Sequence, residues 1–173
     1  FKNKAGKDYA ASRGEYLNGI IMVKYLGFAF VDAAEVIVFD DNGEFASEET
    51  NEKLKKRFEK CDSAVVPGFY GAYRDGRVKT FSRGGSDITG SIVARAIMAN
   101  VYENWTDVSG FLIADPRIID NPAAIETITY KELRELAYMG ATVLHEDAIF
   151  PVRREGIPIN IRNTNKPEDN GTW

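Results

Sequence analysis

The chain of 173 residues has few of the side chains on which several classes of protein site depend. Cys61 is its only cysteine, so no disulfide can form within the chain. His145 is its only histidine, which excludes a His-rich metal site and leaves one candidate for the base of a Ser-His-Asp triad. A single cysteine fits a reducing compartment, and we expect a cytoplasmic protein.

Long apolar runs and an excess of positive charge are also lacking. No run approaches the roughly 20 apolar residues of a membrane span, and residues 1–4 do not begin the apolar core of a signal peptide. The 22 Lys and Arg against 26 Asp and Glu give a net charge of −4, which is no electrostatic footprint for nucleic acid. We therefore expect neither a membrane nor a nucleic acid as a partner. The 44% hydrophobic and 28% charged residues are typical of a soluble domain with a substantial core.

Periodicity and turn signals predict an alternation of helices and strands. Helices are expected over 13–26, 50–60, 86–98, 129–139 and 144–154, and strands over 28–31, 36–39, 64–69, 78–81, within 99–105 and over 157–161. Thr129 and Glu132 form a capping box at the start of one helix. The alternation favours an α/β architecture with a largely parallel sheet and helices on both faces.

The run from Phe81 to Asp87 has the composition of an anion-binding loop. Gly84 and Gly85 lack Cβ atoms, so their backbone N–H groups can closely approach a ligand. Ser86 is predicted to cap the following helix, whose N-terminus favours anions. Arg83 adds a forked positive charge that suits a carboxylate or phosphate, and Asp87 adds a carboxylate able to orient a cation or a lysine. A plain Gly-rich turn before a capped helix accounts for these residues equally well.

A second loop, residues 106–117, follows the strand expected within 99–105. In open α/β sheets, ligands bind at the carboxyl ends of the strands. The two loops can therefore face the same crevice. The polar residues 163–171, which include Pro167 and Gly171, predict a linker.

With both loops placed, the chain resembles the aspartate kinases of the amino-acid kinase family. Four segments match that family's motifs in order: Ser12–Glu15; Gly68–Gly71 followed by Arg83–Asp87; Thr106–Gly110 followed by Ala114–Arg117; and Gly140–His145 followed by Gly156–Pro158 and Arg162–Thr164. The resemblance covers nearly the whole chain. One such motif would be a weak signal, whereas four in order are specific.

The resemblance implies a three-layer αβα sandwich with a mainly parallel sheet, as in the amino-acid kinases and carbamate kinases. Residues 1–162 would form part of the catalytic domain, with the N-terminal part missing. Residues 163–173 would be a linker toward absent ACT regulatory domains. The implied reaction moves the ATP γ-phosphoryl group to the side-chain carboxylate of L-aspartate, giving 4-phospho-L-aspartate. This is the first step toward lysine, threonine and methionine. The resemblance also implies Mg²⁺ with the ATP, and a homodimer in the intact protein.

The family's substrate residues map onto the first three motifs. Arg83 resembles the residue that grips an aspartate carboxylate, and Glu15 the partner of the substrate's α-ammonium, a role that an acceptor-only carboxylate suits. Gly84, Gly85 and Ser86 would complete the pocket. Asp87 resembles the loop carboxylate that helps to orient the family's catalytic lysine.

The family's nucleotide contacts fall at positions spread over the second half of the chain: Thr106, Asp107, Leu112, Arg117, Thr142 and Val143. Leu112 stands where many members carry Tyr, which puts a stacking contact there in doubt. Thr142 stands where the family usually has Lys, and threonine cannot supply that charge. Glu146 replaces a usual Pro and adds a negative charge nearby.

The largest departure is the absence of the family's opening strand and Lys-Phe-Gly-Gly loop, which carries the catalytic lysine. We therefore expect the 173 residues alone to lack kinase activity. Two alternatives stay open: a kinase for another small acid such as glutamate, acetylglutamate, carbamate or UMP, and a noncatalytic ligand-binding or regulatory module of the same fold. The Arg83–Asp87 loop and the Arg162–Thr164 segment favour aspartate. The gene sequence upstream of Phe1 would separate a truncated chain from a real loss of the lysine.

Overall fold

The computed structural model describes residues 6–115, 118–138, 144 and 146–173. The first half of the chain contains α1 (Lys7–Leu26), β1 (Ala29–Phe30), α2 (Ala33–Val36), β2 (Val38–Phe39), α3 (Ser47–Phe58), β3 (Ala64–Val65), β4 (Tyr70–Tyr73) and β5 (Val78–Thr80). The second half contains α4 (Gly85–Ala96), β6 (Tyr102–Thr106), α5 (Tyr130–Tyr138), α6 (Glu146–Arg154) and β7 (Ile159–Asn163).

The strands form short sheets that are mostly parallel. β1 pairs with β3, β2 with β4, and β6 with β7, all in parallel. β4 and β5 form the antiparallel hairpin that the turn at 74–77 predicts. In the β6–β7 pair, Tyr102 lies opposite Ile159 and Thr106 opposite Asn163. The predicted α/β class with a mainly parallel sheet is confirmed.

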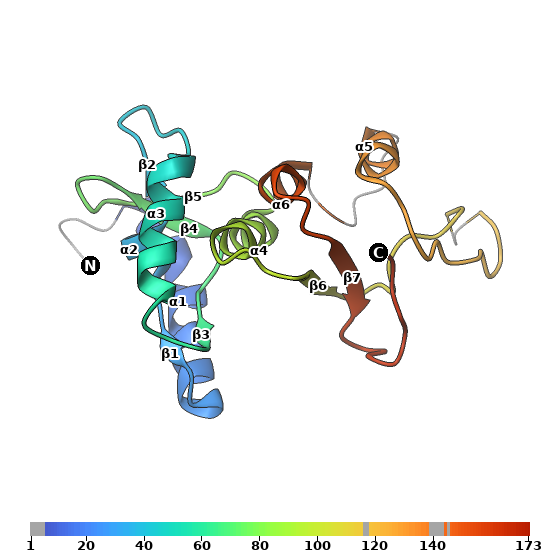
Figure 1. The fold of residues 1–173 in the computed structure, drawn as a ribbon, viewed down its shortest axis with the longest axis horizontal. Coiled ribbons are helices and arrows are strands. Elements are labelled where there is room, and N and C mark those ends of the chain that lie inside the picture. Colours follow the sequence, from blue (N-terminus) through green and yellow to red (C-terminus); the bar gives the residue numbers. More distant parts are fainter. Residues whose placement is uncertain (1–5, 116–117, 139–143, 145) are drawn as a thin grey trace.

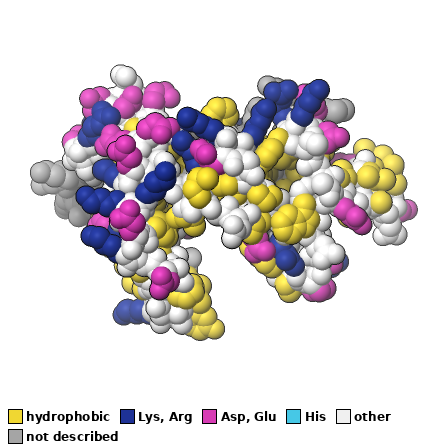
Figure 2. All heavy atoms as spheres, viewed as in Figure 1, with side chains coloured by type: hydrophobic (Ala, Val, Ile, Leu, Met, Phe, Trp, Pro, Cys, Tyr) yellow, Lys and Arg dark blue, Asp and Glu magenta, His cyan; other side chains and the backbone are white. Residues whose placement is uncertain are grey.

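Helix α4 lies in the middle of the molecule (Figure 1). The elements before it, α1–α3 and β1–β5, lie on one side, and β6, β7 and α5 lie on the other (Figure 1). Ile88, Ile92 and Ala96 of α4 are buried in the same apolar core as Leu54 of α3 and Val152 of α6. Charged side chains of both signs gather over α3 and the loop before it (Figure 2). The buried faces of the elements therefore converge on α4, and its N-terminus carries the glycine-rich loop.

The start of α4 differs from the predicted one. The helix begins at Gly85, its N-cap is Gly84 in the left-handed conformation (φ 56°), and no side chain caps it. Ser86 lies inside the first turn, so its prediction as the cap was wrong. The reason is steric: a Cβ on residue 85 would lie 3.0 Å from both Phe69 Cα and Phe81 Cβ, so only glycine allows this close packing.

The strand predicted over 36–39 is shorter than expected. Val36 ends the short helix α2, and only Val38 and Phe39 belong to β2. Asp32 starts α2, since its Oδ1 accepts a hydrogen bond of 3.0 Å from the Ala34 N–H. This local cap outweighs the strand preference of the β-branched residues that follow.

The capping box before α5 is confirmed. The Thr129 N–H donates to Glu132 Oε2 (2.8 Å), and the Glu132 N–H donates to Thr129 Oγ1 (3.2 Å). The hydrogen bonds from Thr129 lower the pKa of the Glu132 carboxyl below its usual value. Among the described residues, no helix is long and apolar enough to cross a membrane.

The segment after β7 folds back onto that strand. Ile161 and Thr172 exchange both backbone hydrogen bonds (2.9 and 3.2 Å), and Thr172 is buried. Residues 163–171 thus form a loop whose two ends are joined by the Ile161–Thr172 hydrogen bonds. Their role as a linker to a further domain stays a prediction.

We expect the Thr50→Val variant to be less stable by about 1–3 kcal/mol, because it leaves a buried N–H without a partner. Thr50 is fully buried, and its Oγ1 accepts the Val38 N–H at 2.9 Å. The matched control is Ser91→Ala, since the Ser91 hydroxyl is equally buried but has no hydrogen-bond partner among the described residues. This variant should stay within about 0.5 kcal/mol of the parent. Urea unfolding measures both, and equal midpoints would contradict the assignment.

Two glycine substitutions should change stability in opposite directions. Gly85→Ala should destabilise the fold by about 1–3 kcal/mol, because its Cβ meets Phe69 and Phe81. Gly14→Ala places a Cβ in open space within α1 and should stabilise the fold by about 0.5–1 kcal/mol. Thermal unfolding checks both, and a stabilised Gly85→Ala variant would show that the contact is not tight.

Candidate functional site

A cleft of about 460 Å³ runs along α4 from Ser86 in its first turn to Ile97 at its C-terminal end. Its walls come from α1, the β3–β4 segment, α4 and β6, and include Glu15, Gly68, Ser86, Thr89 and Glu103. Two predicted substrate residues, Glu15 and Ser86, therefore share one cavity although 71 positions separate them in the chain. Glu15 is exposed, so its carboxylate is available to a ligand in the cleft.

Phe69, next to Gly68 of the cleft wall, has a strained backbone. The sequence motifs gave no indication of this strain. The Phe69 φ of 81° lies in the left-handed region, which is unusual for a bulky side chain and is a hallmark of functional loops. Thr89 holds it there, since Thr89 Oγ1 accepts the Phe69 N–H (3.2 Å) and donates to the Gly85 carbonyl (2.7 Å). The sequence signal was the Pro67-Gly68-Phe69 run, which indicates a tight loop but not which residue is strained.

Asp87 is tied to strand β6 by its neighbours. Asn104 Nδ2 donates to Asp87 Oδ1 (2.9 Å) and to the Tyr102 hydroxyl (3.0 Å). The Tyr102 hydroxyl donates to the Asp87 main-chain oxygen (3.0 Å). Burial raises the pKa of Tyr102 to about 12, so this phenol keeps its proton. Sequence reasoning missed Tyr102 and Asn104, because their partner lies 15 or 17 positions away.

Arg83 lies at the exposed edge of the glycine-rich loop. It makes no hydrogen bond or ion pair within the part of the chain that the structure describes. Its forked donors are therefore free to bind a carboxylate or phosphate. Gly84 beside it is half-buried and Gly85 is buried, so the loop presents Arg83 on a rigid base.

The helix that carries Glu15 is fixed by an aromatic cluster. The Arg13 guanidinium lies 4.3 Å from the centre of the Tyr9 ring and 4.4 Å from that of Tyr16. Its Nη2 also donates to the buried Ser12 hydroxyl at 3.0 Å. The Tyr70 ring lies beyond them, 5.6 Å from the guanidinium. The Tyr9, Tyr16 and Ser12 contacts lie within α1 and hold the Arg13 side chain in place, and the Tyr70 contact joins this helix to β4.

The predicted nucleotide residues lie at the other end of β6. Thr106 ends that strand, and its carbonyl accepts the Thr164 N–H (2.8 Å) and hydroxyl (2.9 Å). The Thr106 hydroxyl donates to Asp107 Oδ1 at 3.3 Å. Leu112, 38% exposed, pairs with Ala124 in an isolated bridge. The structure thus brings the start of the 106–117 loop into contact with Thr164, the last residue of the fourth motif.

The loop after Asp107 is held by the same segment. Asn163 Nδ2 donates to the Ser109 hydroxyl (2.9 Å), which donates to Asp169 Oδ2 (2.6 Å). The Phe111 N–H donates to Thr172 Oγ1 at 2.9 Å. Three predicted nucleotide residues, Arg117, Thr142 and Val143, lie outside the described residues. Among the described residues, no cluster of three His, Cys, Asp or Glu side chains can hold a metal ion.

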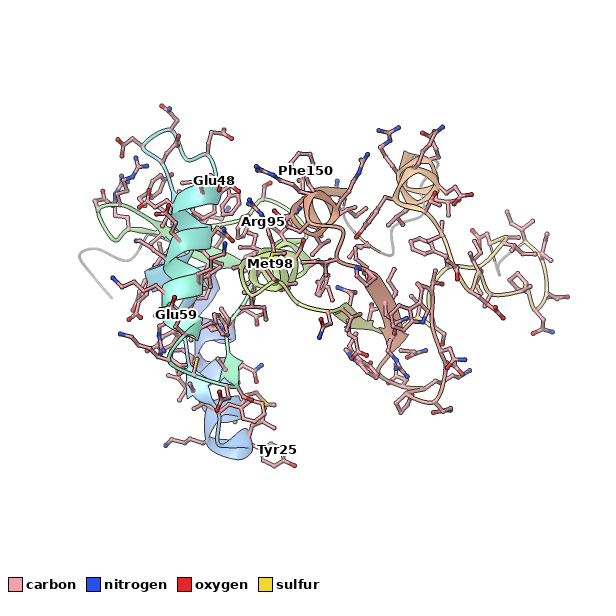
Figure 3. The ribbon with its side chains drawn as sticks, viewed as in Figure 1. Tyr25, Glu48, Glu59, Arg95, Met98 and Phe150 are labelled. Carbon is pink, nitrogen blue, oxygen red and sulfur yellow. The ribbon has the colours of Figure 1, made fainter. Side chains whose placement is uncertain are left out.

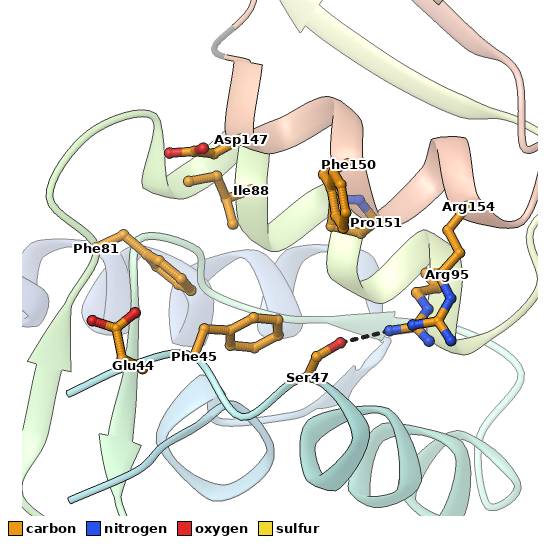
Figure 4. Close-up of a pocket in the computed structure, with 10 residues that line it drawn as sticks. All are labelled: Glu44, Phe45, Ser47, Phe81, Ile88, Arg95, Asp147, Phe150, Pro151 and Arg154. Carbon is orange, nitrogen blue, oxygen red and sulfur yellow. Dashed lines mark hydrogen bonds between the residues drawn. The ribbon is translucent and has the colours of Figure 1, made fainter. Parts of the chain in front are cut away.

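A second cavity, of about 480 Å³, lies between α4, α6 and the loop before α3 (Figure 4). Phe45, Phe81 and Phe150 line its middle, and Arg95 and Arg154 lie at one end. Arg95 is used structurally: its guanidinium bonds Ser47 Oγ (2.7 Å), while Glu48 lies across from it (Figure 3). We therefore take the cleft beside the glycine-rich loop as the candidate functional site.

Comparison with known proteins agrees with this architecture. The sequence matches the profile of the Amino acid kinase family over residues 2–163. It is 39% identical to Aspartokinase 3 of Bacillus subtilis over 95% of this chain and 38% of that protein. It is 35% identical to the chloroplastic Aspartokinase 1 of Arabidopsis thaliana over 96% of this chain and 32% of that protein. The chain thus spans about a third of the length of these relatives.

Solved structures give the same result. The aspartate kinase of Clostridium acetobutylicum superposes with a TM-score of 0.89 and 62% identity, covering 97% of this chain and 38% of that one. Aspartokinase III of E. coli, solved in complex with aspartate and ADP, gives a TM-score of 0.85 and 30% identity over 95% of this chain and 39% of that one. The predicted αβα fold is confirmed. The chain belongs to the amino acid kinase family.

Proposed function

We propose that the chain is the part of an aspartate kinase that binds aspartate and one face of the nucleotide. In this proposal the parent enzyme transfers the ATP γ-phosphoryl group to the side-chain carboxylate of L-aspartate, the first step toward lysine, threonine and methionine. The observation that carries the proposal is the exposed Arg83, which has no partner among the described residues and lies just before α4, while Ser86 in the first turn of that helix shares a cleft with Glu15. The aspartate and ADP bound by the E. coli structure support the choice of ligands.

The physical problem of this reaction is charge repulsion. Acceptor and donor are both anionic, so they approach only when cations and backbone donors lie between them. Arg83 offers a two-pronged contact to one aspartate carboxylate. Glu15 accepts hydrogen bonds from the α-ammonium, and the first-turn N–H groups of α4 offset the remaining negative charge. The amino acid is thereby held by both of its ends, which orients the reacting carboxylate.

The nucleotide would lie along the loop after β6. Thr106 and Asp107 stand at the carboxyl end of a parallel strand, where α/β folds bind their ligands. Arg117, Thr142 and Val143 are proposed to complete that site. Mg²⁺ would accompany the ATP phosphates, since it binds through few protein carboxylates and keeps most of its oxygen ligands from phosphate and water. Asp87 would orient the family's catalytic lysine, which its Lys-Phe-Gly-Gly motif supplies.

Replacement of Arg83 tests the substrate assignment in the full-length gene product. Arg83→Ala should raise the KM for aspartate about ten- to a hundredfold, because it removes a charge-assisted hydrogen-bond pair. Arg83→Lys should recover only part of this loss, since an ammonium lacks the fork. The control is Arg77→Ala, because Arg77 is exposed and bonds Asp75 in the β4–β5 turn. A KM that rises equally in the control, or in neither variant, would refute the role of Arg83.

The 173 residues expressed alone should form no ADP from ATP and aspartate, since they contain no Lys-Phe-Gly-Gly motif. The full-length gene product should turn over under the same conditions. Circular dichroism of the short chain confirms that a folded sample is compared. Ordinary turnover by the short chain would overturn the proposal that a missing lysine limits it.

A further inference from the structure

Asn104 is a polar side chain at a buried position of β6. Tyr102 and Asn104 are buried on the face of this strand that packs against α4, whereas Glu103 and Trp105 are exposed. An amide in such a place destabilises the fold unless its hydrogens find partners. Both hydrogens of Asn104 Nδ2 are satisfied, one by Asp87 Oδ1 and one by the Tyr102 hydroxyl.

These hydrogen bonds form a closed ring that begins and ends on Asp87. Asn104 donates to the Asp87 side chain (2.9 Å) and to the Tyr102 oxygen (3.0 Å), and Tyr102 donates to the Asp87 main-chain oxygen (3.0 Å). The ring therefore restrains both the backbone and the side-chain rotation of one residue. An ionised carboxylate only accepts, so the amide must present its NH₂ group to Asp87.

Close packing keeps the ring in place. A Cβ at Gly90, one turn along α4 from Asp87, would lie 2.7 Å from the Tyr102 hydroxyl oxygen and 2.7 Å from a ring carbon. The helix and the tyrosine ring are thus in direct contact. Asp87 Oδ2 makes no hydrogen bond within the described part of the chain. One oxygen is fixed by the protein and the other is left for a cation.

We propose that Asn104 and Tyr102 are positioning residues that hold the Asp87 carboxylate in the rotamer in which its free oxygen receives the catalytic lysine ammonium. The inference rests on the proposed function, which gives Asp87 that lysine as its partner. Asn104 does not line the cleft, and Tyr102, which does, acts in this role through its hydrogen bonds to Asp87 and Asn104. They act by restricting rotation of the Asp87 side chain, so that its carboxylate keeps the orientation that the lysine requires. Supporting residues preorganise a site in this way.

Among the described residues, no titratable side chain donates to the Asp87 carboxylate, whose one side-chain partner there is Asn104. Tyr102 keeps its proton, as its raised pKa requires. Glu103 is exposed and accepts the Trp105 Nε1–H (3.0 Å). On α6, Asp147 and Arg154 line the second cavity with Ile88 and Arg95. Arg83 lies on the exposed edge of the glycine-rich loop.

The decisive variant is N104D in the full-length gene product, because it replaces the donor by a carboxyl that titrates. Near pH 8 two adjacent carboxylates repel each other, and kcat should fall about tenfold or more relative to the parent. Near pH 6 the introduced group takes up the shared proton and again donates to Asp87, so the ratio of kcat values should recover to within about threefold. Protonation of a buried carboxyl also restores stability, so kcat is normalised to the folded fraction at each pH before the ratios are compared.

The matched control is N160D, on the paired strand. Asn160 is buried like Asn104, but its amide donates to the Asn170 and Thr172 carbonyls (3.1 and 3.3 Å) and not to Asp87. With kcat normalised to the folded fraction at each pH, its ratio to the parent should not change between the two pH values. A second variant, Y102F, removes one hydroxyl and keeps the ring; it should lower kcat about two- to tenfold with both KM values unchanged.

The outcomes separate the two proposals. A parent protein that does not phosphorylate aspartate refutes the proposed function, and the positioning role falls with it. An active parent with a pH-independent ratio for N104D, or with an unchanged kcat for Y102F, refutes the positioning role alone. An acid-restored N104D, an unrestored N160D and a slowed Y102F together establish it. If N104D does not fold, the kcat of Y102F decides.

Discussion

The position of α4 depends on a buried guanidinium near its C-terminal end. Arg95 is 8% exposed, and a charge so nearly withdrawn from water destabilises a fold unless acceptors surround it. Ser47 and Glu48 at the start of α3 supply two of them, and Glu155 after α6 supplies a third at 3.2 Å. Arg95 lowers the pKa of the Glu48 carboxyl, so the group stays an acceptor at neutral pH. One side chain thus fixes three helices relative to one another.

The site at the other end of α4 follows from this constraint. Because its C-terminal half is anchored to α3 and α6, the helix directs its first turn toward the cleft and toward β6. The loop at that end must then fit between Phe69, Phe81 and the strand, which is why a glycine begins the helix. The cleft and the nucleotide loop are joined through β6, which contacts Asp87 at Asn104 and ends at Thr106.

Local signals in the sequence predicted much of this structure. The Thr129–Glu132 capping box, the turn between β4 and β5 and the run of glycines before α4 each depend on neighbours a few positions apart, and such patterns are legible in one sequence. The motifs added Glu15 and Ser86, which the fold brings to one cleft. The prediction of Ser86 as a cap was wrong because it used local preference alone and could not foresee the packing of Phe69 and Phe81 on residue 85.

The contacts that the sequence did not predict join residues that lie far apart in the chain. The Tyr70 hydroxyl donates to Asp32 at 2.8 Å across 38 positions, and Asn104 reaches Asp87 across 17. Nothing in a single sequence marks an asparagine within a strand as the partner of one particular carboxylate. The strain at Phe69 is hidden for the same reason, since the Thr89 hydroxyl that holds it lies on another element.

The left-handed Phe69 has a consequence for engineering. A search for stabilising substitutions ranks such a residue among the first to change, because glycine or asparagine relieves backbone strain of about 1–3 kcal/mol. Here the strained peptide is also the surface on which Gly85 and the first turn of α4 rest. A variant selected for its melting temperature alone would give that loop freedom to reshape the cleft. Residue 69 is therefore a position at which a gain in thermal stability would be a poor guide to a working protein.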